Sequence, residues 1–250
     1  IICIGNLETG GTGKSPLVHY SVKTLINAGL KVAVLSRGYG RSSTGFKLVE
    51  VNSLSTEVGD EPLQTKLRFP DATVVVNENR VNAVKQLLNL EVKIDIVVMD
   101  DGFQHRWVKP SLNILTTPSS FPFWQNAMLP VGTLREAKNE SKRAKALVLT
   151  GGEKTSEPQF DGQIFNSKVA SGKPVQIRGG VFDIELKANV VLLSGIANSH
   201  RFKTTASQRF VVLHHSQFRD HHQYTTKDIQ NLREIYNNFG TAAQAVLTTE

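Results

Sequence analysis

Short apolar runs alternate with stretches of helical periodicity along the first 150 residues of the chain. The apolar runs predict buried strands at residues 1–4, 31–35, 73–76, 94–99, 112–115 and 146–150. Between them, apolar residues recur at helical spacing over residues 15–28, after residue 59 and over residues 79–90. A strand, a helix and a second strand follow one another within 35 residues, which implies a parallel sheet. We therefore expect an α/β fold of the P-loop NTPase type, with helices flanking a parallel sheet.

Two of these helices carry specific signals. Gly59-Asp60-Glu61-Pro62 opens the second helix, where Asp60 suits the N-cap position and Pro62 suits the first turn. The helix over residues 79–90 is predicted to turn these apolar side chains inward: Val81, Val84, Leu87 and Leu88.

The chain becomes polar and rich in Gly, Ser and Lys over residues 151–172, which indicates a domain boundary. Strands resume at residues 190–193, 210–213 and 245–247. A helix that Thr225 or Thr226 caps, and that ends near residue 237, is predicted to bury Ile229, Leu232 and Ile235. We expect a nucleotide-binding domain over residues 1–150, a linker over 151–189 and a smaller α/β lobe over 190–250.

The first strand and the first helix are joined by a glycine-rich loop of sequence NLETGGTGKS. Its glycines let backbone N–H groups approach phosphate oxygens without a Cβ in the way, and the next helix points its N-terminus at the same anion. The order of strand, glycine loop, Lys-Ser and helix predicts a phosphate site in which Lys14 contacts the β- and γ-phosphates and Ser15 ligates Mg²⁺. Glu8 stands where the usual pattern has its first glycine.

Two adjacent carboxylates, Asp100 and Asp101, directly follow the buried run at residues 94–99. In P-loop enzymes an aspartate at this place holds Mg²⁺ opposite the hydroxyl of the phosphate loop. An Asp-Gly turn is the plainer alternative. Two adjacent carboxylates repel each other unless a cation offsets their charge, which favours the metal site.

Three other segments leave alternatives open. Arg37 and Arg41 follow the second strand and either face phosphate or are solvated loop residues. The aromatic residues at positions 121, 123 and 124 either belong to the core or meet an apolar ligand or a membrane. Asp220-His221-His222 suits a histidine that orients a catalytic carboxylate, or a surface loop, better than a metal cluster, because no third ligand with metal spacing lies nearby.

Composition narrows the function classes only a little. The chain is 40% hydrophobic and 20% charged, and no apolar run is long enough to span a membrane. A net charge of +7 suits an anionic partner such as a nucleotide or an acidic membrane surface. Nucleic acid is the weakest candidate, because the basic residues are scattered and form no patch interleaved with aromatic residues. The chain begins inside a strand without Met and ends just after another, so we expect segments beyond both ends.

Taken together, the motifs resemble one family, the tetraacyldisaccharide 4′-kinases, which are the lipid A 4′-kinases of Gram-negative bacteria. The segments that carry the resemblance run from end to end of the chain: GNLETGGTGKSP, VAVLSRGYGR, GDEP, NENRVNA, DDGFQHR, LPVGTLRE, LLSGIANSHRF and FRDHHQYT. The family also lacks the first glycine of the usual phosphate loop, so Glu8 is no departure from it. Ala137 stands where family members often have Pro.

The resemblance implies transfer of the ATP γ-phosphate to the 4′-hydroxyl of a tetraacylated glucosamine disaccharide 1-phosphate, which gives lipid IV-A. It implies Mg²⁺ as a cofactor, two α/β lobes, and peripheral attachment to the cytoplasmic face of the inner membrane. A membrane-associating N-terminal helix of the family would precede Ile1.

The resemblance also implies roles for individual residues. Asp60 is the expected catalytic base and His221 its partner, with His222 as the alternative. Lys14 and Asp101 are expected to take part in catalysis, and Asp100, Asp101 and Ser15 to hold Mg²⁺. The expected nucleotide-binding residues are Gly10, Gly11, Thr12, Gly13, Lys14, Ser15, Arg135 and Glu136.

A second function class remains open from the residues alone. A P-loop NTPase switch or a metallochaperone would hydrolyse nucleotide to change conformation, and the segment HHSQFRDHH would then load a metal. A nucleic-acid-binding module is a third possibility that rests on net charge alone.

Overall fold

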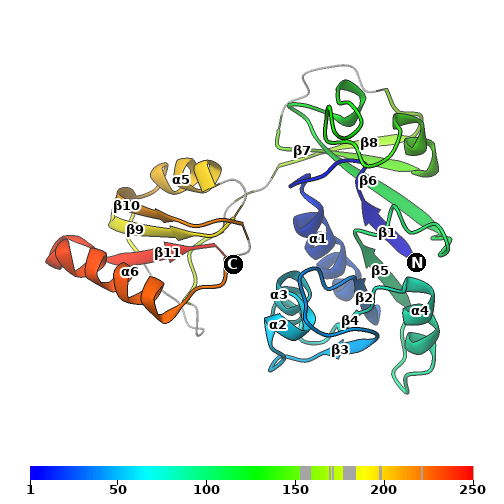
Figure 1. The fold of residues 1–250 in the computed structure, drawn as a ribbon, viewed down its shortest axis with the longest axis horizontal. Coiled ribbons are helices and arrows are strands. Elements are labelled where there is room, and N and C mark those ends of the chain that lie inside the picture. Colours follow the sequence, from blue (N-terminus) through cyan, green and yellow to red (C-terminus); the bar gives the residue numbers. More distant parts are fainter. Residues whose placement is uncertain are drawn as a thin grey trace. The chain divides into compact units, whose positions relative to one another are not determined.

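The computed structural model describes residues 1–152, 159–168, 170, 172–176, 184–196, 199–220 and 222–249. The chain forms two compact units, Ile1–Val169 and Ala170–Glu250. Each unit has its own sheet (Figure 1).

The first unit is built on an eight-stranded sheet with the order β3-β4-β2-β5-β1-β6-β7-β8. Its strands are β1 (Ile2–Gly5), β2 (Val32–Ser36), β3 (Lys47–Val49), β4 (Thr73–Val76), β5 (Ile96–Asp100), β6 (Leu112–Pro118), β7 (Ala146–Thr150) and β8 (Gln163–Ser167). Neighbouring strands are parallel except for β3, which is antiparallel to β4. The predicted P-loop NTPase type of α/β fold is confirmed.

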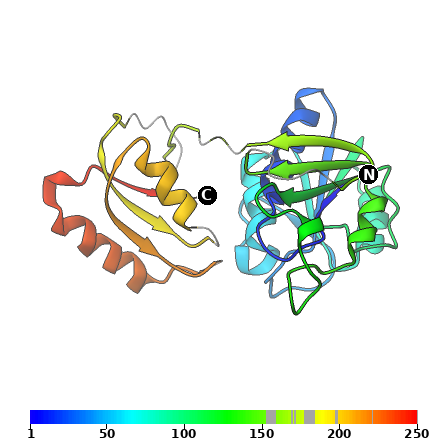
Figure 2. The same ribbon diagram turned by 90° about the horizontal axis from the view of Figure 1, so that it is seen from above.

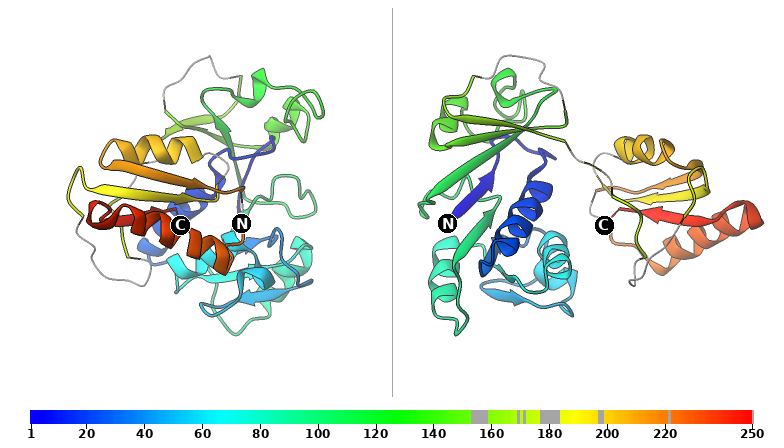
Figure 3. Two further views of the ribbon diagram at one scale, coloured as in Figure 1. Left: turned by 60° about the vertical axis from the view of Figure 1, so that its left-hand side comes forward. Right: turned by 180° about the vertical axis from the view of Figure 1, so that it is seen from behind.

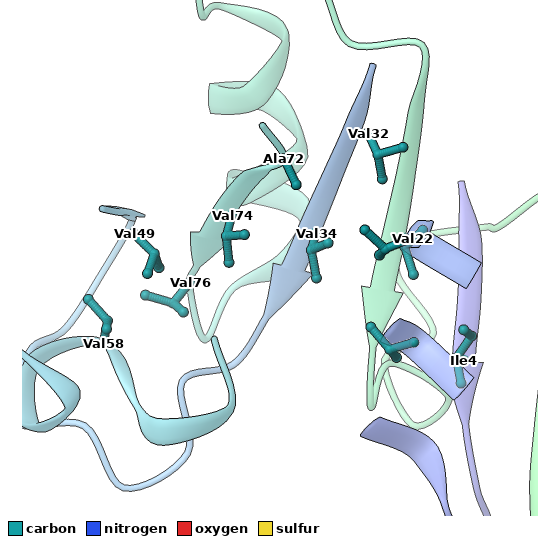
Figure 4. Packing of buried hydrophobic residues seen from close by; sticks show 11 residues of the cluster. Ile4, Val22, Val32, Val34, Val49, Val58, Ala72, Val74 and Val76 are labelled. Carbon is teal, nitrogen blue, oxygen red and sulfur yellow. The ribbon is translucent and has the colours of Figure 1, made fainter. Parts of the chain in front are cut away.

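Helices cover both faces of this sheet. The unit contains α1 (Lys14–Asn27), α2 (Ser55–Val58), α3 (Asp60–Arg68), α4 (Arg80–Leu88) and the short 3₁₀ helices η1 (Phe123–Gln125) and η2 (Lys138–Arg143). Val22 of α1 joins Val34 of β2 in one buried cluster (Figure 4). Leu87 of α4 joins Leu35, the next residue of β2, in another cluster. Because successive side chains of a strand point to opposite faces, α1 and α4 lie on opposite sides of the sheet.

The aromatic segment after β6 is divided between core and surface. Phe123 and Trp124 are buried with Leu115 and Leu147 of the neighbouring strands β6 and β7, which run side by side with β8 (Figure 2). The core alternative is therefore correct for these two residues. Phe121 is 52% exposed.

The structure differs from the predicted elements of the first unit in two strands. Gln163–Ser167, which the sequence placed in the linker, forms β8 and pairs with β7. β8 is an edge strand whose Phe165 is half exposed, so it lacks the apolar pattern of a buried strand. β3 was not predicted, because its three residues are too few to show the alternation of apolar and polar side chains that marks a strand.

Two predictions about helices are also corrected: the N-cap of α3 and the burial of Leu88 in α4. Gly59, with a φ of 92°, takes the N-cap position of α3, so Asp60 is instead the first residue of the helix. A carboxylate remains favourable there, because the first turn presents unpaired N–H groups. Leu88 is 80% exposed, whereas Ala83 and Leu87 are buried. One residue is about 100° of helix rotation, which carries Leu88 off the buried stripe.

The second unit is a parallel three-stranded sheet in the order β10-β9-β11. It consists of β9 (Asn189–Ser194), α5 (Ser199–Ser207), β10 (Val211–Gln217), α6 (Thr226–Asn238), η3 (Gly240–Ala242) and β11 (Ala245–Thr248). α5 and α6 lie on opposite sides of the sheet (Figure 3). Thr225 and Asp228 form a capping box at α6. No residue of α6 is fully buried. Ile229 is 50% exposed, so the predicted burial of Ile229 is wrong.

None of the helices in the described part of the chain is long and apolar enough to cross a membrane.

Substituting Gly5 with alanine is expected to cost roughly 1–3 kcal/mol of unfolding free energy. A Cβ at position 5 would lie 2.6 Å from Phe103 Cβ and 3.0 Å from the Phe103 backbone nitrogen, so backbone would have to move. Gly11→Ala is the matched control, because a Cβ there meets no heavy atom within 4 Å. Urea unfolding of the nucleotide-free protein measures both variants, and equal losses would contradict the proposed clash.

Candidate active site

The phosphate loop, residues 6–13, connects β1 to α1. Gly10 has a φ of 95° and Gly13 a φ of 83°, in the left-handed region that glycine adopts without strain. A Cβ at position 13 would also lie 2.9 Å from Thr150 Cγ2. Gly13 is the N-cap of α1, so the unpaired N–H groups of the first helical turn directly follow the loop. This is the arrangement that binds phosphate in P-loop proteins.

Thr12 supports the loop from inside the protein. Its side chain is 2% exposed, accepts a hydrogen bond from Asn6 Nδ2 at 2.8 Å and lies 2.8 Å from Thr116 Oγ1. Thr150 Oγ1 donates to the Thr12 carbonyl at 3.0 Å. The Thr12 side chain thus anchors the loop to β6 and β7, and nucleotide binding by Thr12 stays a prediction.

Glu8 ties the loop to the segment that precedes Arg135. The residue is 3% exposed, and its carboxylate accepts hydrogen bonds from Thr117 Oγ1 at 2.8 Å and from Asn126 Nδ2 at 2.9 Å. Burial raises the pKa of Glu8, and these two hydrogen bonds oppose the rise. Glu8 also forms an antiparallel bridge with Leu134. The sequence marked this position as unusual but did not indicate its partners.

Glu8→Gln is expected to stabilise the protein more near pH 8 than near pH 4. Burial raises the folded-state pKa of Glu8 above its ordinary 4.5, so the folded protein holds this proton more tightly than the unfolded chain. Its contribution to stability is therefore present below pH 4.5 and is lost as the pH rises through the folded-state pKa. Glutamine has a similar shape and does not ionise, so it removes this loss.

Urea unfolding across this pH range measures the effect, and Glu91→Gln at an exposed position controls for the loss of one negative charge. A free-energy difference between Glu8→Gln and the wild type that stays constant with pH would contradict the assignment.

An acidic pair, Asp100 and Asp101, lies at the carboxyl end of β5. Asp100, its last residue, is 7% exposed. Burial raises the pKa of Asp100 to about 7, and the negative charges of Glu61 and Asp101 add to the rise. Burial also opposes ionisation of Asp101, but the hydrogen bonds from Arg135 and the charge of Lys14 outweigh it and lower its pKa. The pair therefore combines a carboxylate whose ionisation Arg135 and Lys14 favour with one whose ionisation burial and neighbouring negative charge oppose.

Two cations converge on Asp101. Lys14 Nζ lies 3.7 Å from Asp101 Oδ1, and Arg135 Nη2 donates to the same oxygen at 2.9 Å. Arg135 also donates to the side-chain oxygen of Asn6 in the phosphate loop. Its backbone nitrogen donates to the Leu7 carbonyl at 2.7 Å, which fixes the arginine beside the loop. The fold thus brings together Lys14, Asp101 and Arg135 from three separate segments.

The start of α3 reaches the same region. Glu61 Oε1 accepts a hydrogen bond from Ser15 Oγ at 2.6 Å. Asp60, the residue before it, is exposed at the first position of α3. The sequence pattern predicts a role for Asp60 of the GDEP segment and gives no signal for Glu61. Its contact with Ser15 joins the first turn of α3, which begins with Asp60, to the first turn of α1.

The predicted partner of Asp60, His221, lies outside the described residues. The alternative, His222, lies 3.1 Å from Asp228 Oδ2 through Nε2 and stacks on Phe218 with ring centroids 4.5 Å apart. His222 is therefore part of the structure that caps α6 in the second unit.

Glu136 is held by cations rather than directed at the phosphate loop. Its carboxylate accepts hydrogen bonds from Arg143 at 2.7 Å, from Gln104 at 3.0 Å and from Arg106 at 3.2 Å. Gln104 Nε2 also donates to the Asn6 carbonyl at 2.8 Å. Of the predicted Arg-Glu pair, Arg135 contacts the phosphate loop directly and Glu136 does so through Gln104.

Comparison with known proteins identifies the family. A family model described as tetraacyldisaccharide-1-P 4′-kinase matches residues 1–250. The chain belongs to this family. The tetraacyldisaccharide 4′-kinase of Bacteroides thetaiotaomicron is 34% identical to this chain, and the aligned region covers 100% of this chain and 72% of that enzyme. The enzyme of the same name from Flavobacterium psychrophilum is 35% identical, and the aligned region covers 100% of this chain and 75% of that enzyme.

A solved structure agrees with the assignment to the tetraacyldisaccharide-1-P 4′-kinase family. LpxK from Aquifex aeolicus, crystallised in complex with ATP, has a TM-score of 0.78 and 30% sequence identity. The match covers 99% of this chain and 76% of the Aquifex chain. The chain is therefore a kinase by family, which favours the enzyme class over the switch and metallochaperone alternatives.

Two further polar residues of this family member lie near the acidic pair and were not predicted as site residues. Arg80 is 3% exposed, and its charge acts on both Asp100 and Asp101. Its backbone nitrogen donates to His105 Nε2 at 3.3 Å. Burial, followed by the charge of Arg80, lowers the pKa of His105. Both residues lie in motifs that carried the family resemblance, NENRVNA and DDGFQHR, which was the available signal.

The loop arginines after β2 have different environments. Arg41 pairs with Glu78 and donates to the Gly45 carbonyl at 2.7 Å, so its role is to hold the loop. Arg37 is exposed.

The oxygen atoms of Ser15, Asp100 and Asp101 are of the type that Mg²⁺ prefers. The raised pKa of Asp100 reflects burial and surplus negative charge, which a divalent cation would offset. Among the described residues, no three His, Cys, Asp or Glu side chains are grouped so that they could hold a metal. The oxygen ligands and the surplus negative charge at Asp100 fit a Mg²⁺ ion, and the described part of the chain contains no metal-loading cluster.

Proposed function

We propose that this chain transfers the γ-phosphate of ATP to the 4′-hydroxyl of a tetraacylated glucosamine disaccharide 1-phosphate, and so makes lipid IV-A. The observation that carries the proposal is the convergence of Lys14, Arg135 and the acidic pair on the phosphate loop of a member of this family. Phosphoryl transfer depends mainly on positioning and on stabilisation of charge, and these residues supply both.

ATP would bind with its phosphates in the loop. The backbone of Gly10, Gly11 and Gly13 and the N-terminus of α1 would cradle the phosphates, and Lys14 would contact the β- and γ-phosphates. The Lys14 ammonium lies 3.7 Å from Asp101 Oδ1, so a phosphate in the loop would be a second anionic partner beside Asp101. Arg135, which contacts the same Asp101 oxygen as Lys14, would help to stabilise the charge of the transferred group.

Mg²⁺ would be held by Ser15, Asp100 and Asp101. When bound, the ion neutralises charge on the phosphates and on the acidic pair. The Ser15 hydroxyl, which donates to Glu61, would offer its oxygen to the ion. Asp100 would release its proton, because a cation in contact favours the ionised carboxylate.

Asp60 would accept the proton of the 4′-hydroxyl as general base, with His221 as its partner. Its exposed position at the start of α3, adjacent in sequence to the residue that binds Ser15, supports this role. A carboxylate that reaches the acceptor hydroxyl can remove its proton as the phosphoryl group arrives.

The acceptor implies the place of work. A tetraacylated sugar is held in a bilayer, so the enzyme would act as a peripheral protein at the cytoplasmic face of the inner membrane. The net charge of +7 supports attraction to an anionic membrane surface. No nucleic acid partner is proposed.

The test uses γ-labelled ATP with and without tetraacyldisaccharide 1-phosphate in detergent. Label in the lipid that requires both Mg²⁺ and Lys14 is the expected result. ATP hydrolysis that is indifferent to the lipid, with no label transferred, would contradict the proposal and favour a nucleotide switch.

A further inference from the structure

A long uncharged segment leads from β6 to the active site. Residues 110–134 contain no Asp, Glu, Lys or Arg, although these types make up 20% of the chain. Part of the segment is buried, including its last residue Leu134, but the turn just before that residue is exposed. Met128 is 45% exposed, Leu129 52% and Val131 89%. Exposed apolar side chains gathered in one short segment often mark a site of interaction.

These side chains belong to a reversal of the chain, residues 126–134, which we call the apolar hairpin, although its Met128–Leu134 bridge is parallel and not that of a β-hairpin. The Leu134 backbone nitrogen donates to the Ala127 carbonyl at 2.9 Å, and that of Gly132 donates to the Met128 carbonyl at 3.0 Å. Asn126 Oδ1 accepts hydrogen bonds from the backbone nitrogens of Ala127 and Thr133. A Cβ at position 132 would lie 2.3 Å from the Ala127 carbonyl oxygen. The turn is therefore closely packed and presents its apolar tip to solvent.

The base of the apolar hairpin is joined to the phosphate loop. The Thr9 backbone nitrogen donates to the Thr133 carbonyl at 2.8 Å, and that of Arg135 donates to the Leu7 carbonyl at 2.7 Å. The buried carboxylate of Glu8 accepts from Asn126 at the same place. An extended segment advances about 3.3 Å per residue, so the tip at Val131 lies within about 10–15 Å of Arg135.

We propose that the apolar hairpin inserts its tip into the bilayer that contains the acceptor lipid, and so holds the phosphate loop at the membrane surface. Apolar side chains of surface-bound segments enter a bilayer by about 5–10 Å, which agrees with a tip that projects from the site by a few residues. An uncharged segment enters without the cost of burying a charge. The inference rests on the proposed function in one respect: the acyl chains of the acceptor place it in a bilayer.

The first test measures insertion at the tip. Val131→Cys is labelled with the environment-sensitive fluorophore nitrobenzoxadiazole. The chain has one native cysteine, Cys3, which is fully buried, so labelling is confined to position 131. With vesicles of phosphatidylethanolamine and phosphatidylglycerol, and without ATP or acceptor, we expect a severalfold rise and a blue shift of emission. Leu88→Cys on α4, where the side chain is 80% exposed, is expected to show neither change.

The second test measures binding by vesicle sedimentation. The double variant Leu129→Ser and Val131→Ser is expected to bind about tenfold more weakly, because less apolar area leaves water. Its control is Leu88→Ser with Val92→Ser, which changes two other exposed apolar residues and is expected to leave binding unchanged.

Several results would overturn the inference. These are unchanged emission at position 131 with vesicles, equal weakening in the two double variants, or a concentration-dependent blue shift without vesicles, which would indicate a second copy of the chain on the tip. Vesicle binding requires neither ATP nor acceptor, so failure of phosphate transfer would reject the proposed function and leave this result standing.

Discussion

Lys14→Ala is expected to lower kcat for lipid phosphorylation by about a thousandfold, because the variant lacks the ammonium that stabilises charge on the transferred phosphoryl group. Lys14 is the first residue of α1, and its ammonium already lies 3.7 Å from Asp101 Oδ1. Its side chain starts at the residue where the phosphate loop gives way to α1. Steady-state transfer of label from ATP to the acceptor lipid measures the loss.

The matched control for this variant is Lys23→Ala, an exposed lysine on the same helix. Its removal takes away the same charge from the same helix, away from the phosphate loop, and is expected to leave kcat within about twofold. The Lys14–Asp101 pair is partly exposed, and Arg135 still binds Asp101 when Lys14 is replaced, so the fold is expected to persist. Activity of Lys14→Ala within tenfold of the wild type would contradict the assigned role.

Asp60→Asn is expected to lower kcat by about 10²–10⁴-fold, the usual contribution of a general base, with little change in ATP affinity. Asparagine keeps the shape of the side chain at the start of α3 but cannot accept the proton of the acceptor hydroxyl. Retained ATP affinity separates this role from nucleotide binding, because the phosphate loop is unchanged. The measurement combines the transfer assay with equilibrium binding of ATP.

The control is Asp71→Asn, an exposed carboxylate just beyond the end of α3. If Asp60→Asn turned over at the wild-type rate, the base would have to lie elsewhere. If it lost ATP affinity in proportion to kcat, Asp60 would instead act through the nucleotide site.

Elements with strong local signals could be predicted from the sequence. The strand at residues 73–76 and the strand at residues 146–150 match β4 and β7 residue for residue, because continuous apolar runs between turn residues leave few alternatives. β8 could not be predicted in the same way, since an edge strand is stabilised mainly by its pairing with β7 and needs no apolar pattern of its own.

In the candidate site, too, some features follow from a local sequence pattern and others depend on residues far apart in the chain. Gly13, Lys14 and Ser15 are contiguous, so their relation to one another follows from a local pattern of loop and helix. That pattern does not predict that the Thr12 side chain is buried in the protein. It also does not predict that two arginines hold Glu136. Both depend on side chains that are far away in the sequence.

The sequence by itself determined the α/β fold, the phosphate loop and the acidic pair, because each is encoded within a few consecutive residues. Only the tertiary structure decided that Arg135 meets Lys14 at Asp101, that Glu61 binds Ser15, and that Glu8 connects the loop to the apolar hairpin. The reason is physical: parallel strands bring their carboxyl ends to one edge, and the partners that gather there are separated by tens of residues of intervening helix and loop.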